Sequence, residues 1–128
     1  KQAGALPLLK DENKLRLALA KYNELIRKHP SSDKIDDSAY NAGVIYEYLK
    51  DYSIALLYYK RAYQWDPKTI HPARFRTARI LDKNLHRYSE ALQIYQEAVR
   101  TEGQYEKYRE WKEFAEKRIS ELQKIDEG

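Results

Sequence analysis

The side chains that could do chemistry in this chain are three histidines and one pair of adjacent aspartates. His29, His71 and His86 could bind a metal ion or act as general bases, because imidazole does both near neutral pH. They share no i, i+4 spacing with one another or with a row of carboxylates, as ligands on one helix face would. Asp36 and Asp37 are adjacent, and adjacent side chains on a helix point in different directions. We therefore expect exposed histidines near helix ends, and aspartates that complement the dipole of a helix N-terminus.

The composition excludes several other chemistries. The chain has no cysteine, which rules out disulfides, thiolate nucleophiles and zinc–thiolate sites. Its four glycines form no phosphate-binding loop, and no serine lies in a nucleophile elbow. The sequence therefore predicts a protein that is not an enzyme and that needs neither a metal ion nor a cofactor.

Length, charge and hydropathy indicate one helical domain. The chain has 128 residues, of which 34% are charged, and its glycines and prolines are scarce. This composition is typical of an all-α protein with solvated outer faces. The 24 basic and 20 acidic residues give a net charge of +4, which permits an anionic partner without requiring one. The longest apolar run, 54–59, is far shorter than the roughly 20 residues that span a bilayer, so no transmembrane segment is expected.

Apolar residues recur at three- and four-residue steps along most of the chain, which predicts helices. The predicted helices cover residues 11–29, 35–50, 53–65, 71–85, 89–101 and 104–127. Residues 1–9 contain Gly4 and Pro7, which make a poor helix interior, so we expect the frayed end of a helix there. A very short turn joins the helices at 35–50 and 53–65, which predicts an antiparallel hairpin. Gly103 is predicted to be a left-handed C-terminal stop.

One pattern of apolar and small residues recurs along the chain. Around Ala55 it consists of Tyr52, Leu56, Tyr59, Ala62, Tyr63 and Pro67. The same offsets 36 residues later give Tyr88, Ala91, Leu92, Tyr95, Ala98, Val99 and Gly103. The same offsets 37 residues earlier give Leu15, Ala18, Leu19, Tyr22, Leu25, Ile26 and Pro30. A repeat of this period predicts stacked structural units that each contact their neighbours.

The best-formed unit resembles the tetratricopeptide repeat. The residues that carry the resemblance are Ala42, Gly43, Tyr46, Ala55, Tyr59, Ala62 and Pro67. The alanines and the glycine would let helices approach closely, and the aromatic rings would fill the spaces between them. The following unit has Arg79 and Asp82 where this one has Gly43 and Tyr46, so we expect looser or rearranged packing there.

The resemblance implies a right-handed superhelical stack of antiparallel helix hairpins, an α-solenoid, with a long capping helix at its C-terminal end. The repeats would occupy 1–103, as a half or degenerate repeat at 11–30 and repeats at 36–67 and 72–103, and the cap would occupy 104–128. The linker PSSDKIDDSAY resembles the BamD-like and YbgF-like repeats of bacterial envelopes. This implies the periplasm or cell envelope, with the cytoplasm as the alternative.

The family also implies a non-catalytic scaffold that holds a peptide or helix of a partner protein in a concave groove. The groove positions carried onto this chain are Tyr40, Asn41, Val44, Glu47, Tyr48, Arg76, Ile80, Lys83 and Asn84. Tyr40, Val44 and Tyr48 follow at four-residue steps and lie off the packing stripe. Because the array is short, an upstream repeat or self-association is also expected.

The basic residues around 71–87 leave two alternatives open. They could pair with acids in surface salt bridges, or Arg76 and Lys83 could meet an acidic partner in the groove. A competing hypothesis is an RNA-associated repeat of the half-a-TPR kind, suggested by twelve tyrosines and the segment YREWKEF. Most tyrosines recur at packing positions, however, as Tyr52, Tyr59, Tyr88 and Tyr95 show. They are therefore expected in the core, and nucleic acid is not the expected partner.

Overall fold

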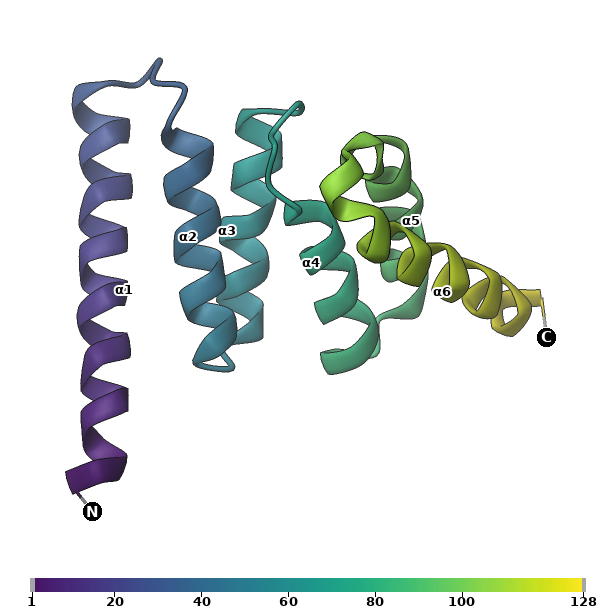
Figure 1. The fold of residues 1–128 in the computed structure, drawn as a ribbon, viewed down its shortest axis with the longest axis horizontal. Coiled ribbons are helices and arrows are strands. Elements are labelled where there is room, and N and C mark those ends of the chain that lie inside the picture. The colour runs from purple at the N-terminus through teal and green to yellow at the C-terminus, as the bar shows by residue number, and fades with distance from the viewer. Residues whose placement is uncertain (1, 128) are drawn as a thin grey trace. The chain divides into compact units, whose positions relative to one another are not determined.

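A computed structural model describes residues 2–127, with side chains from 12 to 125, and it confirms the all-α prediction (Figure 1). Every regular element in this described part is helical. The chain divides into two compact units, Lys1–Asp66 and Pro67–Gly128, which are described separately below. The superhelical stack stays a prediction.

The first unit consists of α1 (Gln2–Lys28), α2 (Ile35–Tyr48) and α3 (Tyr52–Trp65). Helices α2 and α3 form the predicted antiparallel hairpin, and α1 packs against α2 (Figure 1). Helix α1 begins at Gln2 and runs through Gly4 and Pro7, so the segment expected to be a frayed helix end and the helix predicted at 11–29 form one continuous helix. A proline removes one backbone hydrogen bond, and a helix of 27 residues retains the others.

The hairpin of the first unit is held by a close approach of α2 and α3. Ala42 is fully buried in α2, and a Cβ atom built on the neighbouring Gly43 would lie 2.6 and 2.7 Å from two ring carbons of Tyr59. Tyr59 itself is fully buried in α3. The predicted packing of an aromatic ring against a small residue is thus confirmed in this hairpin.

The turn that joins α2 to α3 has a left-handed residue, Lys50, at φ 64°. The N–H groups of Lys50 and Asp51 donate to the carbonyls of Glu47 and Tyr46, both at 2.9 Å, which satisfies groups left over at the end of α2. His86, 36 residues later, is the other described non-glycine residue with a positive φ, at 55°. The repeat therefore extends to the turn of each hairpin.

The second unit begins with α4 (Ala73–Arg79), which continues as the π-helix η1 (Ile80–Asn84), and α5 (Tyr88–Arg100) follows. Two short 3₁₀ turns, η2 (Glu102–Gln104) and η3 (Glu106–Tyr108), lead to α6 (Arg109–Glu127). The predicted last helix thus begins at residue 109 rather than 104. The predicted left-handed stop at Gly103 is also wrong, because no described glycine has a positive φ. The chain instead enters η2, whose first residue, Glu102, is bound to the start of α4.

The repeated alanines and tyrosines differ in how far they are buried. Ala55, Ala91, Tyr59 and Tyr95 are buried, as predicted. Tyr88 is 41% exposed, so its predicted place in the core is wrong. It is the first residue of α5, and its hydroxyl lies 3.1 Å from Nδ1 of the exposed His86.

We expect Gly43→Ala to destabilise the chain by about 1–3 kcal/mol, because the added methyl group would overlap the ring of Tyr59. This loss should appear although alanine favours a helix over glycine by about 1 kcal/mol. Urea unfolding followed by far-UV circular dichroism measures the change.

The matched control is Gly103→Ala, because the nearest atoms to a Cβ there lie at 3.5 Å, an ordinary van der Waals distance. We expect this variant to unfold as the unchanged chain does. A Gly43→Ala variant that is as stable as this control would contradict the assigned role of the glycine.

Candidate functional site

Three of the predicted groove residues lie on the accessible part of α2. Tyr48 is 65% exposed, Asn41 is exposed, and Val44 is half-buried. They follow one another at three- and four-residue steps, which places them on one helix face. These side chains could contact a partner.

Two other predicted groove residues of α2 contact Tyr59 of α3 within the hairpin. Tyr40 is 9% exposed, and its ring lies 5.5 Å from that of Tyr59. Glu47 accepts a 2.6 Å hydrogen bond from the Tyr59 hydroxyl. Tyr40 is therefore not the exposed anchor that the sequence predicted, because an aromatic side chain gains more by packing in the core.

The predicted groove residues of the second unit also include both exposed and buried side chains. Lys83 and Asn84 are exposed in η1, and Arg76 is half-buried with its guanidinium 5.3 Å from the centre of the Trp111 ring. Ile80 is fully buried and cannot present a side chain to a partner, so this prediction is corrected. Burial of an isoleucine stabilises the fold by about 1.5–3 kcal/mol.

A buried carboxylate that the sequence analysis did not identify as important lies in the π-helix. Asp82 is 1% exposed and accepts hydrogen bonds from Nε and Nη2 of Arg118, both at 2.8 Å, and from the Tyr95 hydroxyl at 2.9 Å. Burial alone would raise the pKa of Asp82, but the hydrogen bonds from Arg118 and Tyr95 outweigh it and lower the pKa. The rearranged packing expected at position 82 is thus confirmed, and it takes the form of an ion pair that joins α6 to η1.

A second buried carboxylate caps α4. Glu102 is 1% exposed and accepts hydrogen bonds from the backbone N–H groups of Arg74 at 2.8 Å and Phe75 at 3.2 Å. The guanidinium of Arg74 also contacts Glu102 at 3.2 Å and Glu97 at 2.7 Å. Burial raises the pKa of Glu102 to about 7, while the N–H donors and the charge of Arg74 oppose the rise. Arg74 is therefore a structural cation rather than a surface one.

An aromatic cleft lies among α4, α5 and α6 of the second unit. Its volume is about 210 Å³, and its walls are Phe75, Arg79, Tyr95, Glu110, Trp111 and Phe114. The guanidinium of Arg79 lies 5.2 Å from the centre of the Trp111 ring, a cation–π contact. The arginines of the predicted basic helix thus contact aromatic and acidic side chains of their own unit: Arg76 and Arg79 contact Trp111, and Arg74 contacts Glu97 and Glu102.

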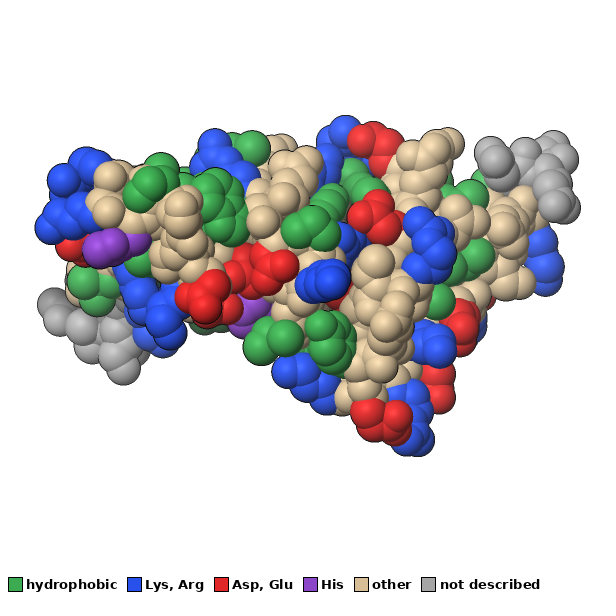
Figure 2. All heavy atoms as spheres, turned by 90° about the horizontal axis from the view of Figure 1, so that it is seen from above, with side chains coloured by type: hydrophobic (Ala, Val, Ile, Leu, Met, Phe, Trp, Pro, Cys, Tyr) green, Lys and Arg blue, Asp and Glu red, His purple; other side chains and the backbone are tan. Residues whose placement is uncertain are grey.

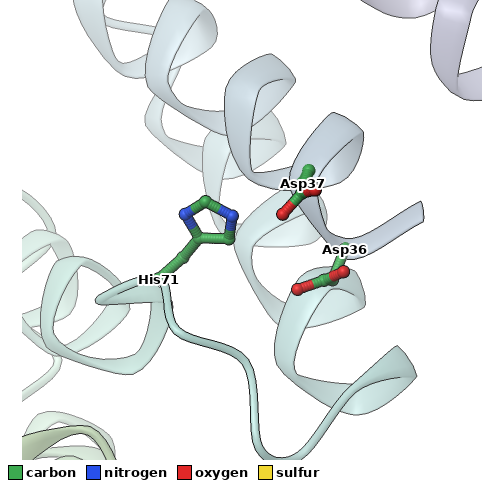
Figure 3. A group of neighbouring side chains, drawn as sticks. All are labelled: Asp36, Asp37 and His71. Carbon is green, nitrogen blue, oxygen red and sulfur yellow. The ribbon is translucent and has the colours of Figure 1, made fainter. Parts of the chain in front are cut away.

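The histidines and the aspartate pair do not assemble a metal site within either unit. Asp36 and Asp37 lie in the first turn of α2, as predicted, and belong to the first unit, whereas His71 belongs to the second (Figure 3). Among the described residues, no group of three possible metal ligands lies within one unit. His29 and His86 are exposed near helix ends, as expected.

Charged side chains of both signs are interspersed over the face shown in Figure 2, with hydrophobic side chains between them. No helix in the described part of the chain has the length and apolarity needed to cross a membrane. No protein-family model matches the chain, and no curated protein matches it. The resemblance to tetratricopeptide repeats therefore stays a prediction.

We expect Asp82→Asn to destabilise the chain by about 3 kcal/mol near neutral pH, because Arg118 loses the charge that balances it. The folded-state pKa of Asp82 lies below the ordinary value of 3.8, so its ion pair stabilises the fold above that pH and is lost as the pH falls through the lower pKa. The difference between the variant and the unchanged chain should therefore shrink in strong acid. Urea unfolding at a series of pH values measures it.

The matched control is Glu121→Gln, which removes the more exposed partner of the same arginine. An exposed ion pair contributes little, so this variant should unfold almost as the unchanged chain does. Equal effects of the two substitutions would contradict the central role of Asp82.

Proposed function

We propose that the chain is a non-catalytic protein-binding module of helical hairpins, which binds a peptide or a helix of a partner protein. In the first unit the binding surface is Asn41, Val44 and Tyr48 on α2. In the second unit Arg76, Lys83 and Asn84 supply polar contacts. The bacterial-envelope setting rests on the resemblance of one linker and stays a prediction.

The exposure of Tyr48 is the observation that supports this proposal most directly. The hairpin core is filled by Ala39, Ala42 and Tyr59, which are all fully buried, while Tyr48 on the same helix is 65% exposed. An aromatic side chain that the core does not use, next to polar neighbours, has the character of an interface anchor. Tyrosine also adds a hydroxyl that can hydrogen-bond with a partner's backbone.

A selection from a library of displayed peptides tests the proposal. Peptides enriched on the immobilised chain are synthesised and titrated against Tyr48→Ala, and we expect their affinity to fall at least about tenfold, as for loss of an interface anchor. Thermal unfolding of the variant should stay the same, because Tyr48 is outside the core. Tyr59→Ala, in contrast, should lower the unfolding free energy by about 3 kcal/mol.

Leu57→Ala is the matched control for binding, since Leu57 is 46% exposed on α3. We expect this variant to bind the selected peptides as the unchanged chain does. If Leu57→Ala and Tyr48→Ala weaken binding equally, the surface assigned on α2 is wrong. If no peptide is enriched, the proposed function is wrong.

The nucleic-acid hypothesis makes the opposite prediction in a salt series. A basic groove that reads single-stranded RNA would bind at low salt and lose affinity steeply as salt rises. Because Arg74 and Arg118 are held in ion pairs with the buried acids Glu102 and Asp82, we expect little binding of labelled oligouridine at any salt. Fluorescence anisotropy measures it, and tight binding that salt abolishes would favour RNA instead.

A further inference from the structure

Four large apolar side chains of the first unit are exposed on two neighbouring helices. Leu17 on α1 is 72% exposed. On α3, Ile54, Leu57 and Trp65 are between 36% and 46% exposed. Helices α1 and α3 both run antiparallel to α2, and an aromatic pair joins them (Figure 1). Leu17 and Ile54 occupy the same position of the repeat, 37 residues apart, so the apolar character extends over both helices.

The repeat itself does not require apolar side chains at these positions. The positions that hold Ile54, Leu57, Arg61 and Trp65 on α3 hold Glu90, Gln93, Glu97 and Thr101 on α5, 36 residues later. The side chains on α5 are polar, as is usual for a helix face in water. The packing of a hairpin therefore does not account for the apolar face of α3. An exposed apolar patch of this kind marks a contact with a protein or a membrane.

The charges of the first unit are segregated by helix. Helix α3 contains Lys60 and Arg61 and no acid, whereas α2 contains three acids and no base. Asp51 and Asp66 lie just beyond the two ends of α3. Arg61 is exposed, and its guanidinium lies 5.1 Å from the centre of the Tyr58 ring, a cation–π contact. Between its ends, α3 thus offers only positive charge.

Helix α1 adds positive charge beside Leu17. Lys14 and Lys21 are exposed three residues before and four residues after Leu17, so all three lie on one helix face. Glu24 is the acid of that face among the described residues, and Lys28 balances its charge at 3.2 Å. The surface formed by α1 and α3 is therefore basic as well as apolar, and it complements an anionic partner.

A lipid surface suits this combination better than a protein or RNA does. Lysine is depleted at the buried centres of protein interfaces, where apolar anchors fill pockets. At a membrane, lysine and arginine lie among the anionic headgroups while leucine, isoleucine and tryptophan enter the boundary of the acyl chains. RNA binding relies on rings that stack on the bases, which leucine and isoleucine do not provide. The alternation of basic and aliphatic side chains thus favours lipid.

We propose that the surface formed by α1 and α3 binds an anionic membrane, with the chain lying on the membrane rather than spanning it. Its apolar members are Leu17, Ile54, Leu57 and Trp65, and its basic members are Lys14, Lys21 and Arg61. This surface is separate from the peptide surface on α2, so the inference is independent of the proposed function. The peptide titrations contain no vesicles, and Leu57→Ala remains their control.

Two kinds of vesicle test the proposal with the full chain: phosphatidylcholine alone, and an equal mixture of phosphatidylcholine and phosphatidylglycerol. We expect the chain to co-sediment with the mixed vesicles at least about tenfold more tightly than with the neutral ones, because the lysines are attracted to anionic headgroups. Sodium chloride should release it, because salt screens that attraction. Equal binding to both kinds of vesicle, or no binding to either, would overturn the proposal.

Trp65 shows whether this surface is the one that contacts the lipid. The other tryptophan, Trp111, belongs to the second unit. Mixed vesicles with brominated acyl chains should quench the emission of the unchanged chain, because Trp65 enters the boundary of the acyl chains. They should quench Trp65→Phe much less, although this variant still co-sediments, since phenylalanine keeps the apolar contact. Equal quenching of the two chains would overturn the assignment of the surface.

Two matched pairs of variants separate this surface from the net charge of the chain. Leu17→Ser is paired with Ile125→Ser, since both side chains are largely exposed and Ile125 lies on α6. Lys21→Glu is paired with Lys124→Glu, an equal change of charge at an exposed residue of α6. We expect the first member of each pair to bind mixed vesicles at least about fivefold more weakly, and the second to bind as the unchanged chain does. Equal losses within both pairs would overturn the proposal.

All four of these side chains are exposed, so the variants should keep the circular dichroism of the unchanged chain. The comparison of vesicles needs no substitution, and it decides the proposal even where a variant fails to fold.

Discussion

The hydroxyl group of a fully buried tyrosine must find a hydrogen-bond partner, and this requirement shapes both hairpins. Tyr59 and Tyr95 occupy the same position of the repeat, and each donates to a carboxylate on the preceding helical segment, Glu47 at 2.6 Å and Asp82 at 2.9 Å. Glu47 is only half-buried, whereas Asp82 is fully buried and needs a cation. Arg118 on α6 supplies that cation. The carboxylate that accepts the hydrogen bond of the Tyr95 hydroxyl thus also binds Arg118, and this ion pair holds α6 to the second hairpin.

The two hairpins differ at the residue that packs against the core tyrosine in the first of them. Gly43 allows the ring of Tyr59 to pack against the backbone of α2. The equivalent residue 36 positions later is Arg79. Its long side chain has to be accommodated where Gly43 has none. Its guanidinium lies over Trp111, and Arg79 and Tyr95 both line a cleft of about 210 Å³. Replacement of a glycine by an arginine therefore accompanies a change from close helix packing to a partly open aromatic site.

Sequence periodicity predicted the helices and the small-residue contacts because both depend on local spacing. Ala55, Ala91 and Gly43 are buried where the repeat places them. The ion pair of Asp82 with Arg118 joins residues 36 apart through tertiary packing, which no local pattern records. The left-handed stop predicted at Gly103 is wrong for a related reason, since the neighbouring Glu102 binds the start of α4 through tertiary packing. The candidate surface on α2 was predicted only in part, because the exposure of Tyr48 and the burial of Tyr40 depend on how the helices pack.

The use of arginine in the second unit bears on the class of partner. Arg74 is 4% exposed and is committed to Glu97 and Glu102, while Arg118 is committed to Asp82 and Glu121. A nucleic-acid surface needs cations that reach phosphates, and its affinity depends on how many do so. Here Arg74 and Arg118 instead neutralise buried acids. Arginine, tryptophan and tyrosine, which line the cleft of the second unit together, are residue types enriched at the anchor sites of protein interfaces.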